Sequence, residues 1–220
     1  MKKIDEIIKE AKKQNRKVYR IKYQPYSFEI AKIVWYKLAT GLIGDIEICE
    51  QNKLIWNELI KYVHGDESSI YDINKTICLM GRTGSGKSKT MQIMQKYIAI
   101  DDVKFVRREK VISFSYNIIS ARYILDQYCT NGYDGIWNFE HFSNICIDDL
   151  GSEPKEGLYF GTRLNVLNEI IERRYEKGLT THFTTNLDEL GINDNYNDRV
   201  YSRIKENCNM IVMNDKDFRI

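Results

Sequence analysis

The segment GRTGSGKS, from Gly81 to Ser88, carries the strongest chemical signal in this sequence. Its pattern, a glycine, four further residues and then Gly-Lys-Ser, is typical of a loop that binds phosphate groups. Successive backbone N–H groups can curl around a phosphate only where side chains are absent, and glycine supplies that freedom. Lys87 would reach the β- and γ-phosphates, and the Ser88 hydroxyl would ligate Mg²⁺. The sequence therefore predicts a nucleoside triphosphate site with Mg²⁺. The residues expected to contact the nucleotide are Gly81, Arg82, Thr83, Gly84, Ser85, Gly86, Lys87, Ser88 and Lys89.

Two adjacent carboxylates, Asp148 and Asp149, close the apolar run ICIDD downstream of this loop. An acid at the end of a buried strand is typical of the Walker B arrangement, which would place it facing the Mg²⁺ held by Ser88. Asp148 would hold the metal through water, and Asp149 would orient and deprotonate an attacking water. A turn or a helix cap is the other interpretation of an Asp pair, and the preceding phosphate loop favours the catalytic one.

Two further polar signals fit the same chemistry. Asn186 closes the segment THFTTN, where a neutral amide can position a water and sense the γ-phosphate. Arg199 and Arg203 lie four residues apart, so that they share one face of a helix. A guanidinium suits the charge that develops on a phosphoryl group because it donates several hydrogen bonds at fixed geometry. We expect Arg203 to have this role, whereas an exposed helix face is an equal alternative for Arg199.

These side chains can meet only if strands and helices alternate to form a parallel sheet. Thr76 to Met80 is a short apolar run that predicts a buried strand, and Met91, Met94 and Ile98 follow the loop at helical spacing. A phosphate would then lie at the positive end of that helix. The predicted fold is α/β, with five parallel strands flanked by helices and the ligand at their carboxyl ends. The strands are expected at 76–80, 111–116, 144–147, 180–185 and 209–213, and further helices near 28–38, 54–63, 118–132 and 159–177.

The chain divides near residue 65. Residues 1–65 are expected to form a small helical, basic region that binds a partner, and residues 66–220 the nucleotide-binding core. The first twenty residues hold eight Lys or Arg against three acids, and Ile4, Ile7 and Ile8 follow helical spacing. This pattern predicts a basic amphipathic helix that docks on the body of the protein or on a partner. The last expected strand ends close to Ile220, so we expect no helical lid domain after the sheet.

Composition narrows the class of protein. A length of 220 residues with 43% hydrophobic content predicts one α/β domain with a small appendage. The net charge of +2 is too small to indicate nucleic acid by itself. The five cysteines are scattered and form no CxxC pair, which predicts a reducing compartment and neither a disulfide framework nor a zinc site. No apolar signal segment or run of membrane-spanning length is present, so a cytoplasmic protein is expected.

The motifs GRTGSGKS, ICIDDLGSE, IIERRYEKG, FTTNL and RVYSRIKENCNMI occur in the order and approximate spacing of a known family. Over roughly residues 50–220, the sequence resembles the DnaC/DnaI-like helicase loaders and the related IstB-type transposition ATPases, a branch of the AAA+ P-loop ATPases. The resemblance implies ATP and Mg²⁺ as ligands and hydrolysis to ADP and phosphate. The N-terminal 50 residues lie outside it, and in such loaders that part carries partner specificity.

The resemblance also implies a role for each matched residue. Most AAA+ proteins have Asp-Glu in Walker B, so the shorter Asp149 implies slow hydrolysis. The segment from Asp134 to Phe142 matches no expected element. The matched positions are Lys87 and Ser88 for Walker A, Asp148 and Asp149 for Walker B, Asn186 for sensor 1, Arg203 for an arginine finger given to a neighbouring subunit, and Arg219 for sensor 2.

The favoured hypothesis is an ATP-hydrolysing helicase loader that assembles head to tail through Arg203 and engages single-stranded DNA and a replicative helicase. A basic stretch with interleaved tyrosines, from Lys104 to Arg122, could follow a DNA strand by combining charge with stacking. The alternatives are an IstB-like helper of a transposase and an ATP-gated adaptor with little hydrolysis. A nucleotide kinase would need neither Asn186 nor a trans-acting arginine, and a GTPase is disfavoured because NKxD and DxxG motifs are absent.

Overall fold

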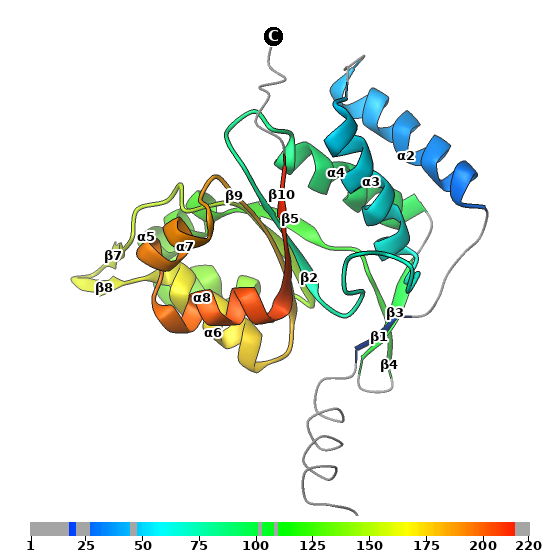
Figure 1. Ribbon diagram of the computed structural model, residues 1–220. Helices are drawn as coiled ribbons and strands as arrows, with labels where there is room; N and C mark the ends of the chain where they lie inside the picture. The colour runs from blue at the N-terminus through cyan, green and yellow to red at the C-terminus, as the bar shows by residue number, and fades with distance from the viewer. Residues whose placement is uncertain (1–17, 21–26, 45–47, 101–102, 108–109, 214–220) are drawn as a thin grey trace, which may run out of the picture.

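The computed structural model describes residues 18–20, 27–44, 48–100, 103–107 and 110–213. Its centre is a five-stranded sheet in the order β10-β2-β9-β6-β5 (Figure 1). Every neighbouring pair in this sheet is parallel, so the predicted parallel α/β fold is confirmed. The strands are β2 (Thr76–Met80), β5 (Asn117–Ser120), β6 (Asn144–Leu150), β9 (Thr180–Thr185) and β10 (Cys208–Val212).

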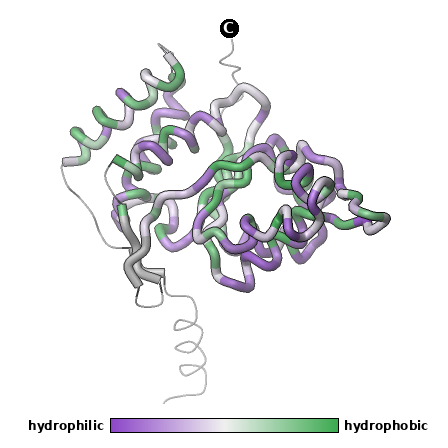
Figure 2. The backbone as a smooth tube through the Cα atoms, turned by 180° about the vertical axis from the view of Figure 1, so that it is seen from behind, coloured by the Kyte–Doolittle hydropathy of each residue, from purple (hydrophilic) through white to green (hydrophobic). Residues whose placement is uncertain are grey.

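Helices cover both faces of the sheet and make two hydrophobic clusters. Because side chains alternate along a strand, Ile77 and Leu79 of β2 enter one cluster and Cys78 and Met80 enter the other. Figure 2 shows hydrophobic residues concentrated along the central strands, as expected for a sheet buried on both faces. One face is covered by α2 (Phe28–Ile43), α3 (Glu50–Val63) and α4 (Lys87–Ile100), and the other by α5 (Ala121–His141), α6 (Val166–Glu176), α7 (Glu189–Asn195) and α8 (Asp198–Asn207).

The parallel strand predicted at Val111–Tyr116 is wrong. Residues Lys110–Ser113 form β4, which pairs antiparallel with β3 (Lys104–Arg107). β3 in turn pairs antiparallel with β1 (Val18–Arg20), so these strands make a separate small sheet. The parallel strand is β5, which begins at Asn117. Apolar residues recur through both β4 and β5, and such a run does not show which distant strand each part will pair with.

The long helix predicted from Tyr159 to Lys177 begins later than expected. Gly157–Tyr159 (β7) and Thr162–Leu164 (β8) form an antiparallel hairpin that projects from the body of the molecule in Figure 1. Its turn contains Gly161 with a φ of 83°, a conformation that suits a turn and ends a helix. α6 starts directly after Asn165, whose side chain accepts a backbone N–H as the N-cap.

Two other helices extend beyond their predicted ends. α2 continues through Gly41 and ends at Gly44, where φ is 82°. α5 continues past Gly132, which interrupts it with non-helical φ and ψ of 62° and −143°. The second part of α5 contains most of the segment from Asp134 to Phe142, for which no element was predicted. A single glycine therefore does not end these helices: α2 continues through Gly41, and α5 continues after a bend at Gly132. Packing of the flanking turns outweighs the low helix propensity of glycine.

The helices before the phosphate loop share a hydrophobic cluster with α4. The Trp35 and Tyr97 rings lie 5.3 Å apart, and Trp56 Nε1 donates to Thr90 Oγ1 at 3.0 Å. His64 Nε2 and the Tyr97 hydroxyl are 2.6 Å apart. The domain boundary at residue 65 stays a prediction, and α2 and α3 pack against α4, the helix that follows the glycine-rich loop.

Some predictions fall outside the described residues. They concern the basic segment 1–17, Arg108 in the proposed DNA stretch, and Arg219. Among the helices that the structure describes, none is long and apolar enough to cross a membrane.

Candidate functional site

The loop from Gly81 to Gly86 joins the carboxyl end of β2 to the first turn of α4. Gly81, Gly84 and Gly86 have φ angles of 144°, 88° and 91°, which residues with side chains rarely adopt. A Cβ at Gly81 would also lie 2.7 Å from the backbone oxygen of Met213. This turn therefore requires the glycines of the phosphate-loop pattern.

The other predicted nucleotide contacts differ in exposure. Arg82 and Thr83 are exposed on the loop, and Lys89 is exposed in the first turn of α4. Ser85 is buried, and its backbone oxygen accepts a hydrogen bond from Asn52 Nδ2 of α3 at 3.5 Å. α3 therefore supports the loop, although it precedes the predicted core in sequence.

Lys87 is only 4% exposed and is surrounded by acceptors. Its Nζ donates to the backbone oxygens of Gly81 at 2.7 Å and Arg82 at 2.8 Å, and to Asn186 Oδ1 at 2.8 Å. Asn186 follows β9 directly, and β9 pairs with β2. The amide predicted to sense phosphate therefore contacts the lysine predicted to bind it.

Asp148 lies beside the predicted metal ligand Ser88. Ser88 Oγ donates to Asp148 Oδ1 at 2.8 Å, and Thr184 Oγ1 donates to the same oxygen at 2.6 Å. Thr184 also accepts from the backbone N–H of Asp149 at 2.9 Å, so one hydroxyl holds both acids. Thr184 was not among the site residues predicted from the sequence. Its signal was its place two residues before Asn186, on the same side of the strand.

Asp149 has a left-handed backbone conformation, with φ of 54°. It lies at a shift in the register between β6 and β9, between Ile147 and Leu150. Asp and Asn adopt this region more readily than other residues that have a Cβ. The left-handed backbone therefore gives a physical reason for an Asp rather than a Glu at this position.

The strand order explains why these residues meet. β9 lies between β2, which carries the phosphate loop, and β6, which carries the acids. Asn186 and Thr184, at the end of β9, therefore reach Lys87 on one side and Asp148 on the other. All of them lie at the carboxyl ends of parallel strands, where ligands of such sheets bind.

Arg199 and Arg203 lie away from this cluster. Both belong to α8, which ends at Asn207 and leads directly into the amino end of β10. The glycine-rich loop lies at the opposite end of the sheet, where the parallel strands have their carboxyl ends. The five-residue strand β10 separates these two ends by about 17 Å. Within its own chain, Arg203 contacts Glu172 and Glu176 of α6, at 3.2 and 3.3 Å.

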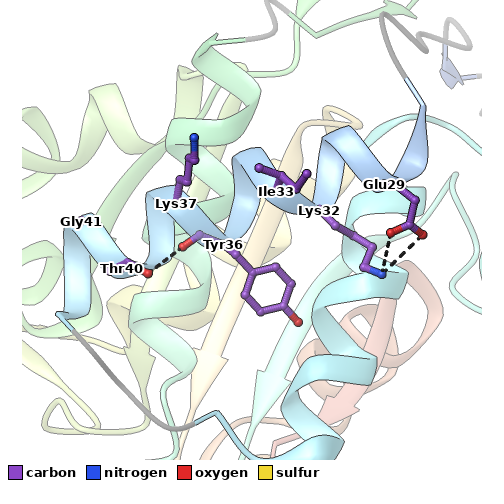
Figure 3. Close-up of a pocket in the computed structure, with 7 residues that line it drawn as sticks. All are labelled: Glu29, Lys32, Ile33, Tyr36, Lys37, Thr40 and Gly41. Atoms are coloured by element: carbon purple, nitrogen blue, oxygen red, sulfur yellow. Dashed lines mark hydrogen bonds and ion pairs between the residues drawn. The ribbon is translucent and has the colours of Figure 1, made fainter.

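A separate hollow of about 550 Å³ lies along α2. Figure 3 shows Ile33 and Lys37 on one side of the helix and Tyr36 on the other. Lys32 pairs with Glu29 at 3.2 Å on the same surface. No predicted site residue lines this hollow, so it is distinct from the phosphate loop.

Comparison with known proteins places this fold. No protein-family model and no curated protein matches the sequence. Among solved structures, the DnaC helicase loader matches with a TM-score of 0.57 and 18% identity, over 83% of this chain and 99% of that chain. The DnaI structure matches with a TM-score of 0.56 and 17% identity, over 83% and 93%. This chain therefore shares its fold with these two structures.

A similar fold occurs in a replication initiator. AMPPCP-bound DnaA from Aquifex aeolicus matches with a TM-score of 0.52 and 16% identity, over 81% of this chain and 51% of that chain. This chain thus corresponds to about half of that initiator. The expected fold, five parallel strands flanked by helices, is therefore confirmed and is shared with these solved structures.

The loop after the acids is held by a buried tyrosine. Tyr196 donates its hydroxyl to the Glu153 carboxylate, and Glu153 Oε2 accepts from the backbone N–H of Gly151 at 2.9 Å. Burial and the Glu153 charge raise the pKa of Tyr196, so the hydroxyl keeps its proton. The loop that follows Asp149 is therefore anchored to the region between α7 and α8.

Proposed function

We propose that this protein is an ATPase of the helicase-loader type, which hydrolyses ATP to ADP and phosphate between neighbouring copies of itself. One observation carries the proposal. The end of β9 bridges the phosphate loop and the acidic strand, because Asn186 contacts Lys87 and Thr184 contacts Asp148. A strand that joins the phosphate-binding lysine to the metal-binding acid is suited to detect a γ-phosphate.

The residues present fit ATP and Mg²⁺. The loop has the glycine conformations that a phosphate cradle requires, and the ammonium of Lys87 lies inside it. Ser88 and Asp148 bring two oxygens within 2.8 Å of each other, and oxygen ligands are those that Mg²⁺ prefers. Bound Mg²⁺ would neutralise charge on the phosphates.

Each side chain then has a defined task. Lys87 binds the β- and γ-phosphates, and Ser88 and Asp148 hold the metal ion. Asn186 orients the attacking water, and Asp149 accepts its proton. Arg203 lies near the amino ends of the strands, whereas the loop of its own subunit lies at their carboxyl ends. Arg203 therefore acts on the nucleotide of a neighbouring copy in a head-to-tail assembly.

Asp149→Asn tests the hydrolysis itself. The substitution keeps a side chain that tolerates the left-handed backbone, so ATP affinity and folding should be unchanged. Loss of the proton acceptor should lower the turnover rate by about 10²- to 10⁴-fold. ATP binding is measured with a fluorescent analogue, and turnover by phosphate release. If turnover stays normal, Asp149 is not the base. If hydrolysis disappears while recruitment and downstream activity persist, the ATP-gated adaptor becomes the better description.

Thr184→Val tests the link between the two acids. Valine keeps the shape of threonine but removes the hydroxyl that contacts Asp148 and the Asp149 N–H. We expect turnover to fall about tenfold, because each lost hydrogen bond misplaces a catalytic group. ADP affinity should change little, and Thr184→Ser should restore turnover. Equal losses in the serine and valine variants would contradict a role for the hydroxyl.

The proposed partners are a replicative helicase and single-stranded DNA. The fold supports this, because the structures that match include a helicase loader and a DnaA initiator bound to single-stranded DNA. In the proposed DNA stretch, Arg122 and Tyr123 are exposed at the start of α5. Binding of single-stranded DNA should therefore weaken as salt rises. Affinity that is indifferent to salt would contradict this part of the proposal.

Residues 1–65 are proposed to select the protein partner. In this region, α2 exposes Phe28, Ile30 and Ile33, and exposed apolar side chains of this kind favour protein contacts. Binding of the full chain to a purified replicative helicase, rather than to a transposase, would separate the loader from the IstB-like helper. A cytoplasmic location is part of the proposal, and Cys78, Cys129, Cys146 and Cys208 are free thiols.

A further inference from the structure

Two arginines and two glutamates form a compact ionic cluster between α6 and α8, here called the α6–α8 tetrad. Arg199 lies 3.1 Å from Glu172 and 3.2 Å from Glu176. Arg203 lies 3.2 and 3.3 Å from the same two residues. Both arginines contact the same oxygen atoms, Oε2 of Glu172 and Oε1 of Glu176. The tetrad is therefore neutral, and its two cations compete for shared acceptors.

Arg203 is the enclosed member of the tetrad. Its side chain is 11% exposed, whereas that of Arg199 is 62% exposed. The Arg203 guanidinium lies 4.7 Å from the centre of the Tyr175 ring, which adds a cation–π contact. Its Nη1 atom lies 3.2 Å from Glu172 Oε2. This nitrogen is buried, and among the described residues it has no hydrogen bond of good geometry. The guanidinium is thus turned toward its own chain and is incompletely satisfied there.

We propose that Glu172 and Glu176 form a latch that holds Arg203 on its own subunit until the nucleotide of a neighbouring copy draws it out. The inference rests on the proposed function, in which Arg203 acts in trans. Arg199 already contacts both shared oxygens, so the acids keep a counter-ion after Arg203 leaves. Glu172 also keeps a hydrogen bond from Asn197 Nδ2 at 3.3 Å.

The latch can open because its contacts are weak and its competitor is strong. Glu176 is 56% exposed, and ion pairs in contact with water contribute little. A triphosphate offers more negative charge than two carboxylates that already share another arginine, and its oxygens match the guanidinium fork. Assembly therefore exchanges one set of acceptors for a better one. Before assembly, only subunits in which Arg203 has left Glu172 and Glu176 are ready to act on the nucleotide of a neighbouring copy.

The double variant Glu172→Gln, Glu176→Gln tests the latch. Phosphate release is measured with saturating ATP and Mg²⁺ over a range of protein concentrations. Neutral amides hold the guanidinium less strongly, so half-maximal turnover should need about three- to tenfold less protein. The plateau rate should not change. Glu169→Gln is the matched control, because Glu169 lies on α6 but pairs with Arg173. It should leave the curve where it is.

Arg199→Ala gives a second measurement of opposite sign. Without Arg199, Arg203 would be the remaining cation on both acids, so more protein should be needed for half-maximal turnover. This variant also decides the case if the double variant does not fold, as checked by thermal unfolding.

The outcomes separate the latch from the proposed function. Unchanged protein dependence in the double variant, or a lowered plateau, overturns the latch. Arg203→Ala, run in the same assay, reports on the composite site alone. If Arg203→Ala hydrolyses ATP normally, the proposed trans role fails and the latch fails with it. If Arg203→Ala is inactive while the double variant behaves like the wild type, only the latch fails.

Discussion

Arg203→Ala is expected to leave ATP binding intact and to lower hydrolysis by about 10³-fold or more, the range lost when an arginine finger is removed. ATP binding should survive because Lys87, Ser88 and Asp148 lie at the carboxyl ends of the strands, away from Arg203, and lose no contact through the substitution. Hydrolysis should fall because, in the proposed assembly, Arg203 supplies positive charge to the neighbour's nucleotide. ATP affinity and phosphate release, measured above the concentration for self-association, check both parts.

The substitution also breaks contacts within the subunit. Arg203 pairs with both Glu172 and Glu176, so its loss leaves Arg199 as their shared partner. Thermal unfolding should therefore accompany the kinetics, so that lost stability is not mistaken for lost catalysis. Normal hydrolysis by Arg203→Ala, at concentrations where the protein self-associates, would contradict a composite site.

Lys87→Ala is expected to abolish ATP binding in the concentration range where the wild-type protein binds. The ammonium is the central donor of the loop, and loss of its charged hydrogen bonds to phosphate should weaken affinity by about two orders of magnitude. Lys96→Ala is the matched control, because Lys96 is exposed on the same helix. Titration with a fluorescent ATP analogue measures both variants. Retained affinity in Lys87→Ala would contradict the phosphate loop.

Mixing the two inactive variants sharpens the test. The Arg203→Ala chain keeps an intact loop, and the Lys87→Ala chain keeps an intact Arg203. In a mixed head-to-tail assembly, roughly a quarter of the interfaces would combine the two intact halves. Hydrolysis should then reappear on mixing, although each variant alone is inactive. No recovery in assemblies shown to be mixed would place Arg203 outside the site.

Local patterns predicted the parts of the site that neighbouring residues make together. The phosphate loop is one continuous turn, so its glycine positions could be recognised without knowledge of the rest of the chain. The acids at the end of β6 and the amide at the end of β9 were recognised for the same reason. Strand and helix types were also predicted where hydrophobic periodicity was strong, as in α3 and β2.

Errors arose where a residue's state depends on a distant partner. The apolar residues of the segment Val111–Tyr116 suit a strand of the parallel sheet and a strand of the small antiparallel sheet equally well. Only the pairing of β4 with β3 shows that β4 belongs to the antiparallel sheet. Thr184 carried no motif of its own, because its importance comes from Asp148 and Asp149, more than 30 residues earlier. Backbone pairing and side-chain contact over such distances follow from tertiary packing, which local propensity does not encode.

The sequence by itself determined the α/β class and the positions of the glycine-rich loop, of the two acids and of the strand-end amide, because each depends on residue types at short spacing. Only the tertiary structure decided that β9 lies between β2 and β6, so that Asn186 and Thr184 join the loop to the acids. The tertiary structure also decided that Arg203 packs against Glu172 and Glu176 of α6, near the amino ends of the strands. The physical reason is that strand order and helix packing are set by the burial of both sheet faces at once, and no single segment contains that information.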